Sequence, residues 1–231
     1  MKKRDVIIAC DFDSESRTLE FLDQFTDEKP FVKIGMELFY SQGPGIVKTL
    51  KSRGHSVFLD LKIHDIPNTV RRAMAVLSEL GADICNLHAG TIDAMQAALQ
   101  DLDSDPAKRP LIIAVTQLTS VTETQLHRQL LIEHGIQDTV VHYAKNALSA
   151  GLSGVVCSPL EVRAVKEACG DSFITVTPGI RFEDNTSQDQ ARVTTPAIAK
   201  QLGCDYIVVG RPITAAASPV ESYRRCLQDF I

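Results

Sequence analysis

The sequence lacks the features that mark several classes of protein. Its 231 residues contain no apolar run long enough to cross a membrane. The net charge of −5 argues against a nucleic-acid partner, which usually requires a basic stripe on the protein surface. The apolar run that follows residues 1–5 is too short for the core of a signal peptide. We therefore expect a cytoplasmic protein with neither a membrane nor a nucleic-acid partner.

Cysteine and histidine show no spacing typical of a metal site or a disulfide framework. No cysteines are spaced as C-x-x-C, and four of the six lie in or beside apolar runs, so we expect reduced, buried thiols. No two of the six histidines combine a four-residue helical spacing with a carboxylate. Since no pattern for thiamine or pyridoxal phosphate is visible either, we expect neither a metal nor another cofactor. The cysteines are Cys10, Cys85, Cys157, Cys169, Cys204 and Cys226.

What the sequence does contain is a series of short apolar runs at fairly even spacing. Each is rich in β-branched residues and apolar on both faces, as in parallel strands buried between two layers. Segments with helical periodicity lie between the runs, such as the one with Val70, Met74, Leu77 and Leu80, which stops at Gly81. The predicted strands are residues 6–10, 31–35, 56–61, 83–87, 111–118, 154–157, 173–176 and 206–209.

Several helices are expected to begin or end at recognisable residues. Thr91 can cap a helix that carries Leu99 and Leu102, and Asn68 or Thr69 can cap the helix that follows residue 65. The remaining signals are the capping box Thr122 and Gln125, the cap–proline pairs Ser158-Pro159, Thr195-Pro196 and Ser218-Pro219, and the helix stops Gly170 and Gly203.

Eight alternations of strand and helix predict a closed (β/α)8 barrel, the TIM barrel, in which residues 1–231 form a single domain. The alternative is an open, doubly wound sheet. Against this alternative, no G-x-G-x-x-G follows the first predicted strand, and no G-x-x-x-x-G-K occurs anywhere in the sequence.

Charged residues are concentrated where the predicted strands end, which is where catalytic groups collect in a barrel. Asp11 follows the first strand, Lys33 lies within the second, and Asp60 and Lys62 end the third. Asp60 and Lys62 are two positions apart, so they should point to the same face, and Asp65 follows at the rim. Since buried charges need partners, these groups should face one another or a ligand. A purely structural salt-bridge network is the alternative.

The ends of the last two strands suggest a phosphate site. Gly179 and Arg181 follow the seventh strand, and Gly210 and Arg211 follow the eighth. Glycine lets the backbone approach a ligand closely, and a guanidinium group can form paired hydrogen bonds with phosphate oxygens. Loops at these two positions often bind phosphate in this fold. The alternative is that both arginines are held at the rim by surface acids.

The segment of residues 60–69, Asp-Leu-Lys-Ile-His-Asp-Ile-Pro-Asn-Thr, resembles the signature of the orotidine 5′-phosphate decarboxylase family. The D-x-K-x-x-D core is shared by related barrels, whereas the longer string is more specific. The resemblance covers nearly the whole chain, including the surroundings of Asp11, Lys33 and Thr119-Ser120, the Pro-Gly-Ile-Arg segment, residues 189–196 and residues 208–214. The chain departs from the family pattern only in loop detail, at residues 88–91 and 185–188.

The resemblance implies decarboxylation of orotidine 5′-phosphate to UMP, the last step of de novo pyrimidine nucleotide biosynthesis, without a cofactor. Lys62 would stabilise the carbanion that develops at C6 and protonate it, and Asp60 would lie near the departing carboxylate. The resemblance also implies a homodimer in which Asp65, Ile66 and Thr69 reach the neighbouring subunit's site. The implied catalytic residues are Lys33, Asp60, Lys62 and Asp65. The implied substrate-binding residues are Asp11, Lys33, Asp60, Ile66, Thr69, Thr119, Ser120, Arg181, Gln190, Gly210 and Arg211.

Two other functions remain open at this point. The first is a metal-dependent decarboxylase of a phosphorylated keto-sugar acid, which would share the D-x-K-x-x-D core but would not be expected to combine Ile66 and Thr69 with Thr119-Ser120. The second is a non-catalytic nucleotide-binding barrel, which would keep Arg211 and Gln190 but has little need for alternating acids and lysines.

Overall fold

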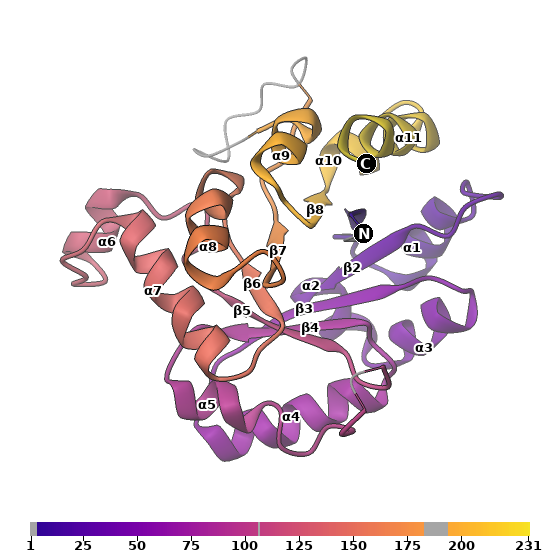
Figure 1. The fold of residues 1–231 in the computed structure, drawn as a ribbon. Helices are drawn as coiled ribbons and strands as arrows, with labels where there is room; N and C mark the ends of the chain where they lie inside the picture. Colours follow the sequence, from indigo (N-terminus) through magenta and orange to yellow (C-terminus); the bar gives the residue numbers. More distant parts are fainter. Residues whose placement is uncertain (1–3, 106, 183–193) are drawn as a thin grey trace.

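The computed structural model describes residues 4–105, 107–182 and 194–231, and its eight parallel strands close into a barrel in chain order (Figure 1). The predicted barrel is confirmed, and the open sheet is wrong. The fifth strand is shorter than predicted, because the chain leaves the sheet after Thr116, whose amide still donates to the Val156 carbonyl at 3.2 Å. The strands are β1 (Asp5–Ala9), β2 (Phe31–Gly35), β3 (Val57–Ile63), β4 (Ile84–His88), β5 (Leu111–Val115), β6 (Gly154–Val156), β7 (Ile174–Thr177) and β8 (Tyr206–Val209).

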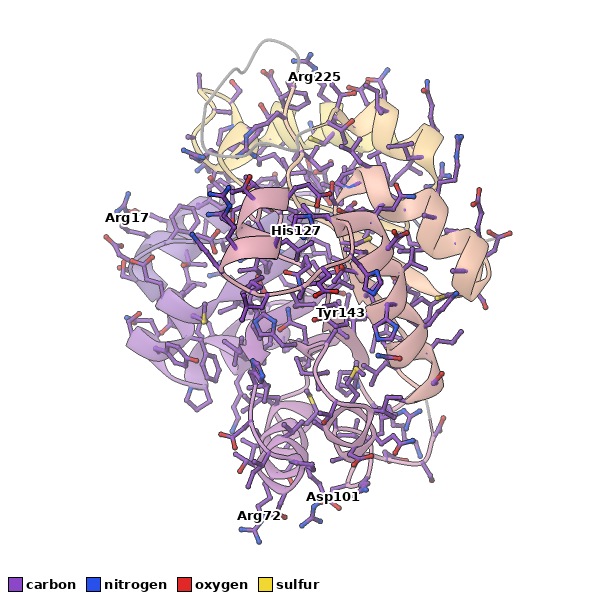
Figure 2. The ribbon with its side chains drawn as sticks, turned by 90° about the vertical axis from the view of Figure 1, so that its left-hand side faces the viewer. Arg17, Arg72, Asp101, His127, Tyr143 and Arg225 are labelled. Carbon is purple, nitrogen blue, oxygen red and sulfur yellow. The ribbon has the colours of Figure 1, made fainter. Side chains whose placement is uncertain are left out.

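Helices surround the barrel and cover the outer face of the sheet (Figure 1). Charged side chains such as Arg17, Arg72 and Asp101 project from the outside of the molecule (Figure 2). None of the helices in the described part of the chain is long and apolar enough to cross a membrane. The helices are α1 (Glu15–Leu22), α2 (Met36–Gln42), α3 (Gly45–Ser52), α4 (Pro67–Glu79), α5 (Ile92–Ala97), α6 (Glu123–Arg128), α7 (Ile136–Ser149), the 3-10 helix η1 (Pro159–Glu161), α8 (Val162–Cys169), α9 (Pro196–Leu202), α10 (Arg211–Thr214) and α11 (Pro219–Phe230).

The apolar core has two parts, one on each face of the closed sheet. The larger part lies between strands and helices and includes Leu59 and Leu61, whereas Phe31 and Phe58 belong to a smaller cluster inside the barrel. Because side chains alternate along a strand, the residues two positions after Phe31 and Phe58 also face the barrel interior. These residues are Lys33 and Asp60, so the inner face changes from apolar to charged toward the carboxyl ends of the strands.

Most of the predicted helix boundaries are found in the structure. Gly170 and Gly203 end α8 and α9, and the helices after Ser158, Thr195 and Ser218 each have proline in the first turn. Thr122 and Gln125 form the predicted capping box. Ser218 occupies its cap position without a side-chain hydrogen bond.

Two predicted details of the helices are wrong. Thr91 does accept a hydrogen bond from the Ala94 amide, but α5 ends at Ala97, so Leu99 and Leu102 lie beyond it and pack against the outer core. Neither Asn68 nor Thr69 is a cap, because both lie inside α4, which begins at Pro67 with Ile66 as its N-cap. Proline favours this first helical position because it has no amide hydrogen to leave unpaired.

Candidate active site

Four side chains of alternating charge lie in a row across the carboxyl ends of β1, β2 and β3. Lys33 Nζ lies 2.8 Å from Asp11 Oδ1 and 3.5 Å from Asp60 Oδ2. Lys62 Nζ lies 2.6 Å from Asp60 Oδ1 on the other side. The row therefore reads Asp11, Lys33, Asp60 and Lys62, and we refer to it as the charged array. The structure thus brings together four charged residues that were predicted from the sequence to lie at the ends of the strands.

The centre of the charged array is buried, while its two ends reach solvent. The side chains of Lys33 and Asp60 are 10% and 14% exposed, compared with 59% for Asp11 and 26% for Lys62. Burial alone would lower the pKa of Lys33, but the Asp60 and Asp11 carboxylates outweigh it and raise that pKa. Burial would likewise raise the pKa of Asp60, but Lys33 and Lys62 keep it below its usual value. The two central groups therefore stay charged at neutral pH.

Lys62 has an unusual backbone conformation, with a φ of 52°. The pairing of β3 with β4 shifts between Leu59 and Ile63, so Lys62 lies in an irregular stretch of the strand. Its amide donates to Asn86 Oδ1 at 2.8 Å, and Asn86 Nδ2 donates to Asp60 Oδ1 at 2.7 Å. Asn86 was not among the site residues predicted from the sequence. Its signal is a polar residue within the apolar β4 run, two positions after Ile84 and therefore on the inner face.

The charged array forms the boundary between two adjoining cavities at the carboxyl end of the barrel. The first, of about 270 Å³, is lined by Lys33, Asp60 and Lys62 together with Gln117, Thr119 and Ser120. Apolar side chains form the rest of its wall, among them Val115, Val156, Val176 and Val208, so a flat ring with polar edges would suit it. Gln117 is a further polar lining residue that the sequence analysis did not single out.

The second cavity, of about 440 Å³, begins at the same lysines and ends at the loops after β7 and β8. Its far end is lined by Gly179, Arg181, Gly210 and Arg211, the residues that the sequence analysis assigned to phosphate. Asp11, at one end of the charged array, also lines this cavity. An elongated ligand with a ring at one end and an anionic group at the other would span both cavities.

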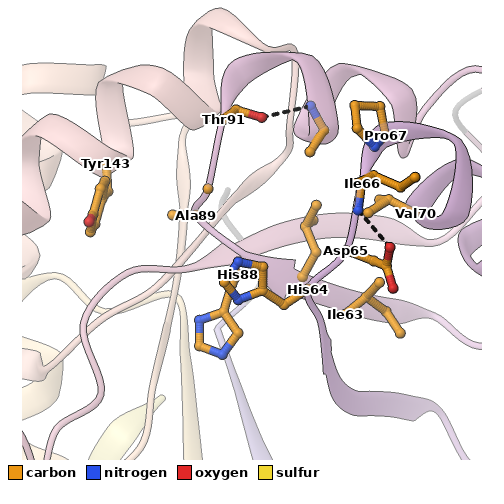
Figure 3. Close-up of a pocket in the computed structure, with 13 residues that line it drawn as sticks. Ile63, His64, Asp65, Ile66, Pro67, Val70, His88, Ala89, Thr91 and Tyr143 are labelled. Carbon is orange, nitrogen blue, oxygen red and sulfur yellow. Dashed lines mark hydrogen bonds between the residues drawn. The ribbon is translucent and has the colours of Figure 1, made fainter. Parts of the chain in front are cut away.

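Asp65, Ile66 and Thr69 do not line either of these cavities. Asp65 Oδ1 accepts a hydrogen bond from the Ile66 amide at 2.7 Å, and the Ile66 side chain is 67% exposed. Asp65 and Ile66 instead line a third cavity, of about 630 Å³, together with His64 and His88 (Figure 3). Within the single chain, none of these three residues therefore lines a cavity that the charged array bounds.

The two histidines of this third cavity lie side by side, with ring centroids 5.3 Å apart (Figure 3). Burial, the neighbouring His64 and the Lys62 ammonium all lower the pKa of His88. The described part of the chain contains no group of three or more histidine, cysteine or acidic side chains that could hold a metal ion. Gln190, assigned to phosphate in the sequence analysis, lies outside the described residues.

Comparisons with known proteins agree with one another over almost the full chain. A family model described as "Orotidine 5'-phosphate decarboxylase / HUMPS family" matches residues 4–226. A Staphylococcus saprophyticus protein named orotidine 5′-phosphate decarboxylase is 53% identical over 226 residues, which cover 97% of each chain. A Geobacillus thermodenitrificans protein of the same name is 52% identical over 228 residues, covering 97% of this chain and 95% of the relative.

Solved structures show the same similarity in three dimensions. The crystal structure of orotidine 5′-phosphate decarboxylase from Lactobacillus acidophilus matches with a TM-score of 0.87 and 38% identity, covering 99% of both chains. An uncharacterised conserved protein from Geobacillus kaustophilus matches with a TM-score of 0.87 and 45% identity, covering 98% of this chain and 100% of the other.

Proposed function

The chain belongs to the orotidine 5′-phosphate decarboxylase / HUMPS family, and we propose that it converts orotidine 5′-phosphate to UMP in the last step of pyrimidine nucleotide biosynthesis. It is a carboxy-lyase, the class of enzyme to which its relatives named orotidine 5′-phosphate decarboxylase belong. The observation that carries the choice of substrate is the charged array, which lies between a cavity suited to a ring and a cavity lined by arginines.

The dimensions of the site support a nucleotide as substrate. In our proposal the pyrimidine ring enters the smaller cavity, where Thr119 and Ser120 contact its polar edge. The ribose lies against Asp11 and Lys33, and the phosphate lies at the far end of the larger cavity. Arg181 and Arg211 supply positive charge there, and Gly210 lets the backbone approach the phosphate oxygens. We assign Gln190 to the same phosphate.

The chemistry needs a positive charge at the reacting carbon. When the bond between C6 and the carboxylate breaks, CO₂ leaves and the electron pair remains on C6, in an orbital that does not delocalise into the ring. A preorganised ammonium group stabilises that pair as it develops, and it also carries a proton to give. We assign both tasks to Lys62 Nζ: the proton moves to C6, and the resulting amine is reprotonated by solvent.

The carboxylates on either side of the lysines have a different task. Asp60 accepts a hydrogen bond from Lys62 Nζ at 2.6 Å and therefore aims the ammonium group. In our proposal Asp60 also lies near the substrate carboxylate, so that loss of CO₂ relieves the repulsion between them. Lys33 Nζ contacts the other oxygen of Asp60, Oδ2, and keeps that carboxylate ionised, as the lowered pKa of Asp60 indicates. Because ammonium and carboxylate groups do this work, we propose that no cofactor takes part.

We also propose that two chains form a homodimer whose sites are completed across the interface. Asp65 and Ile66 are exposed, Thr69 is exposed beside them, and none of the three lines the cavities of its own chain. The apolar side chain of Ile66 is 67% exposed and follows the exposed acid Asp65. Such an exposed apolar side chain is suited to a protein surface that becomes buried on association. In the dimer, Asp65 would extend the charged array of the partner.

The remaining parts of the proposal concern location, partners and domain organisation. All six cysteines are free, and five are buried, which suits a reducing compartment. We therefore place the protein in the cytoplasm, with UMP and its precursor as its small-molecule ligands and without a nucleic-acid or membrane partner. We treat residues 1–231 as one catalytic domain, because the barrel uses strands from both ends of the chain, with β1 paired to β8.

The experiment that tests this function compares two substrates under opposite metal conditions. Purified protein is given orotidine 5′-phosphate with EDTA, and the loss of the orotate ultraviolet band is followed together with UMP formation. A parallel reaction contains a phosphorylated keto-sugar acid with magnesium. We expect turnover only in the first reaction. Turnover only in the second would establish the keto-sugar decarboxylase, and UMP binding without turnover in either would establish the binding barrel.

A further inference from the structure

The catalytic lysine of the proposed function sits on a strained piece of backbone. Lys62 and Leu131 are the two non-glycine residues with positive φ in the described part of the chain, and Lys62 lies within a β-strand. A left-handed conformation brings Cβ close to the following carbonyl oxygen, so a side-chain-bearing residue adopts it only when its surroundings require it. Some contact must therefore hold Lys62 in place.

Asn86 makes that contact. It is fully buried on β4, and its Oδ1 accepts the Lys62 amide hydrogen at 2.8 Å. In a regular strand pair that hydrogen would point to a backbone carbonyl, but the pairing of β3 with β4 is shifted between Leu59 and Ile63. The Asn86 side chain thus replaces the hydrogen bond that the irregular strand pairing leaves unmade at this position.

The other end of the same amide acts on the charged array. Asn86 Nδ2 donates to Asp60 Oδ1 at 2.7 Å, and the same oxygen accepts from Lys62 Nζ at 2.6 Å. The amide can lie only one way round, since its oxygen must face an N–H group and its nitrogen must face a carboxylate. One buried side chain therefore contacts the lysine's backbone and the carboxylate that aims the lysine's ammonium group.

From this geometry we propose that Asn86 is a positioning residue for the decarboxylation, a role that rests on the function proposed above. Its amide fixes both the left-handed conformation of Lys62 and the rotamer of Asp60. In this way it directs Lys62 Nζ into the smaller cavity, which would hold the pyrimidine ring. Without it, the backbone at Lys62 relaxes toward the extended conformation and the direction of its side chain changes. A misplacement of about 1 Å at a reacting group reduces turnover by roughly a hundredfold.

Substitution of Asn86 by aspartate gives a test that a merely structural role would not pass. A protonated aspartic acid reproduces the amide: its carbonyl oxygen accepts from the Lys62 amide, and its hydroxyl donates to Asp60. An ionised aspartate keeps the first bond but repels Asp60. The charged and titratable groups around position 86 are Asp60 and Lys62 on β3, Lys33 on β2 and His88 on the same strand, while the facing residue on β5 is Ile113.

The experiment measures kcat and KM for orotidine 5′-phosphate between pH 5 and 8.5 in wild type, Asn86→Asp and Asn86→Leu. Near pH 8 we expect both variants to lose roughly a hundredfold in kcat, with KM changed much less because the phosphate site is intact. As the pH falls, the ratio of Asn86→Asp to wild-type kcat should rise, by up to about tenfold per unit. The ratio for Asn86→Leu should stay flat.

A matched control is Thr175→Val, which removes a buried hydroxyl at the opposite end of the barrel, where Thr175 Oγ1 donates to Asp205 Oδ2 at 3.1 Å. This variant should lose stability but keep its kcat. A kcat ratio for Asn86→Asp that stays constant with pH, or a wild-type kcat in both Asn86 variants, would overturn the proposal.

A second readout separates this proposal from the proposed function, because it does not depend on turnover. Hydrogen exchange followed by NMR should show a protected Lys62 amide in wild type and a faster-exchanging one in Asn86→Leu, while the amides of β2 stay protected. If wild type does not decarboxylate orotidine 5′-phosphate but shows this difference, the function fails while Asn86 still holds Lys62. Unchanged exchange at Lys62 would refute the positioning role itself.

Discussion

The pair of Lys33 and Asp60 allows the energetics of the charged array to be tested quantitatively. Both side chains are less than one-sixth exposed, and their charged atoms lie 3.5 Å apart. Coulomb's law with an effective dielectric constant of about 20 gives an attraction of about 5 kcal/mol at that distance. Much of this is offset, because Asp11 and Lys62 partly replace a missing partner, so we expect a coupling of about 2 kcal/mol.

The coupling is measured by a double-mutant cycle of Lys33→Met, Asp60→Asn and the double variant. Each single substitution leaves one buried charge with less compensation, whereas the double substitution removes both charges. The double variant should therefore lose about 2 kcal/mol less unfolding free energy than the two single variants lose together. Urea denaturation at pH 7, at one fixed protein concentration, gives the free energies of unfolding.

The exposed pair Arg17 and Asp13 on the surface serves as the control, because its side chains are 63% and 60% exposed. Its cycle should show a much smaller coupling, since water and salt screen charges at the surface. If the effects of Lys33→Met and Asp60→Asn add within about 0.5 kcal/mol, the two groups do not interact energetically and the account of the array is wrong.

Three further predictions follow from the site. Arg211→Ala should lower kcat as well as the affinity for substrate, because binding energy at the phosphate organises the reacting end; an unchanged kcat would contradict this. Mixing Lys62→Ala with Asp65→Ala protein should restore partial activity, since one site of each hybrid dimer would be intact; no recovery despite demonstrated subunit exchange would mean that each site is built from one chain. Since the folded-state pKa of Asp60 lies below the ordinary 3.8, its ionised form stabilises the fold above that pH, and this contribution is lost as the pH falls further. The unfolding free energy of wild type should therefore fall more steeply below about pH 4 than that of Asp60→Asn, and parallel curves would contradict the lowered pKa.

The barrel could be predicted from the sequence because its signal is local and repeated. Strands such as 31–35 and 206–209 are apolar on both faces, and each is followed by a helical segment, so no long-range information is needed to identify the alternation. The candidate site followed from a rule of the fold, since residues at the carboxyl ends of different strands meet at one end of the barrel. Asp11, Lys33 and Asp60 come together for this reason.

The details that were missed depend on contacts between strands. The positive φ of Lys62 has no signal in its own segment, because it results from the shifted pairing with β4 and from the Asn86 side chain. Strict alternation placed Asp60 and Lys62 on the same face, but it could not show that an irregular strand brings their charged atoms within 2.6 Å. The start of α4 was misplaced because Asn68 and Thr69 are good capping residues, whereas Pro67 decides the first turn.

The central claim is that Lys62 Nζ stabilises and protonates C6, and one comparison tests it most directly. Wild type, Lys62→Ala and the surface control Lys48→Ala are assayed for UMP formation from orotidine 5′-phosphate, and each is titrated with UMP to show that the site is intact. We expect Lys62→Ala to bind UMP but to form none from substrate at any measurable rate, while Lys48→Ala behaves as wild type. Decarboxylation by Lys62→Ala at a rate near that of wild type would contradict the account.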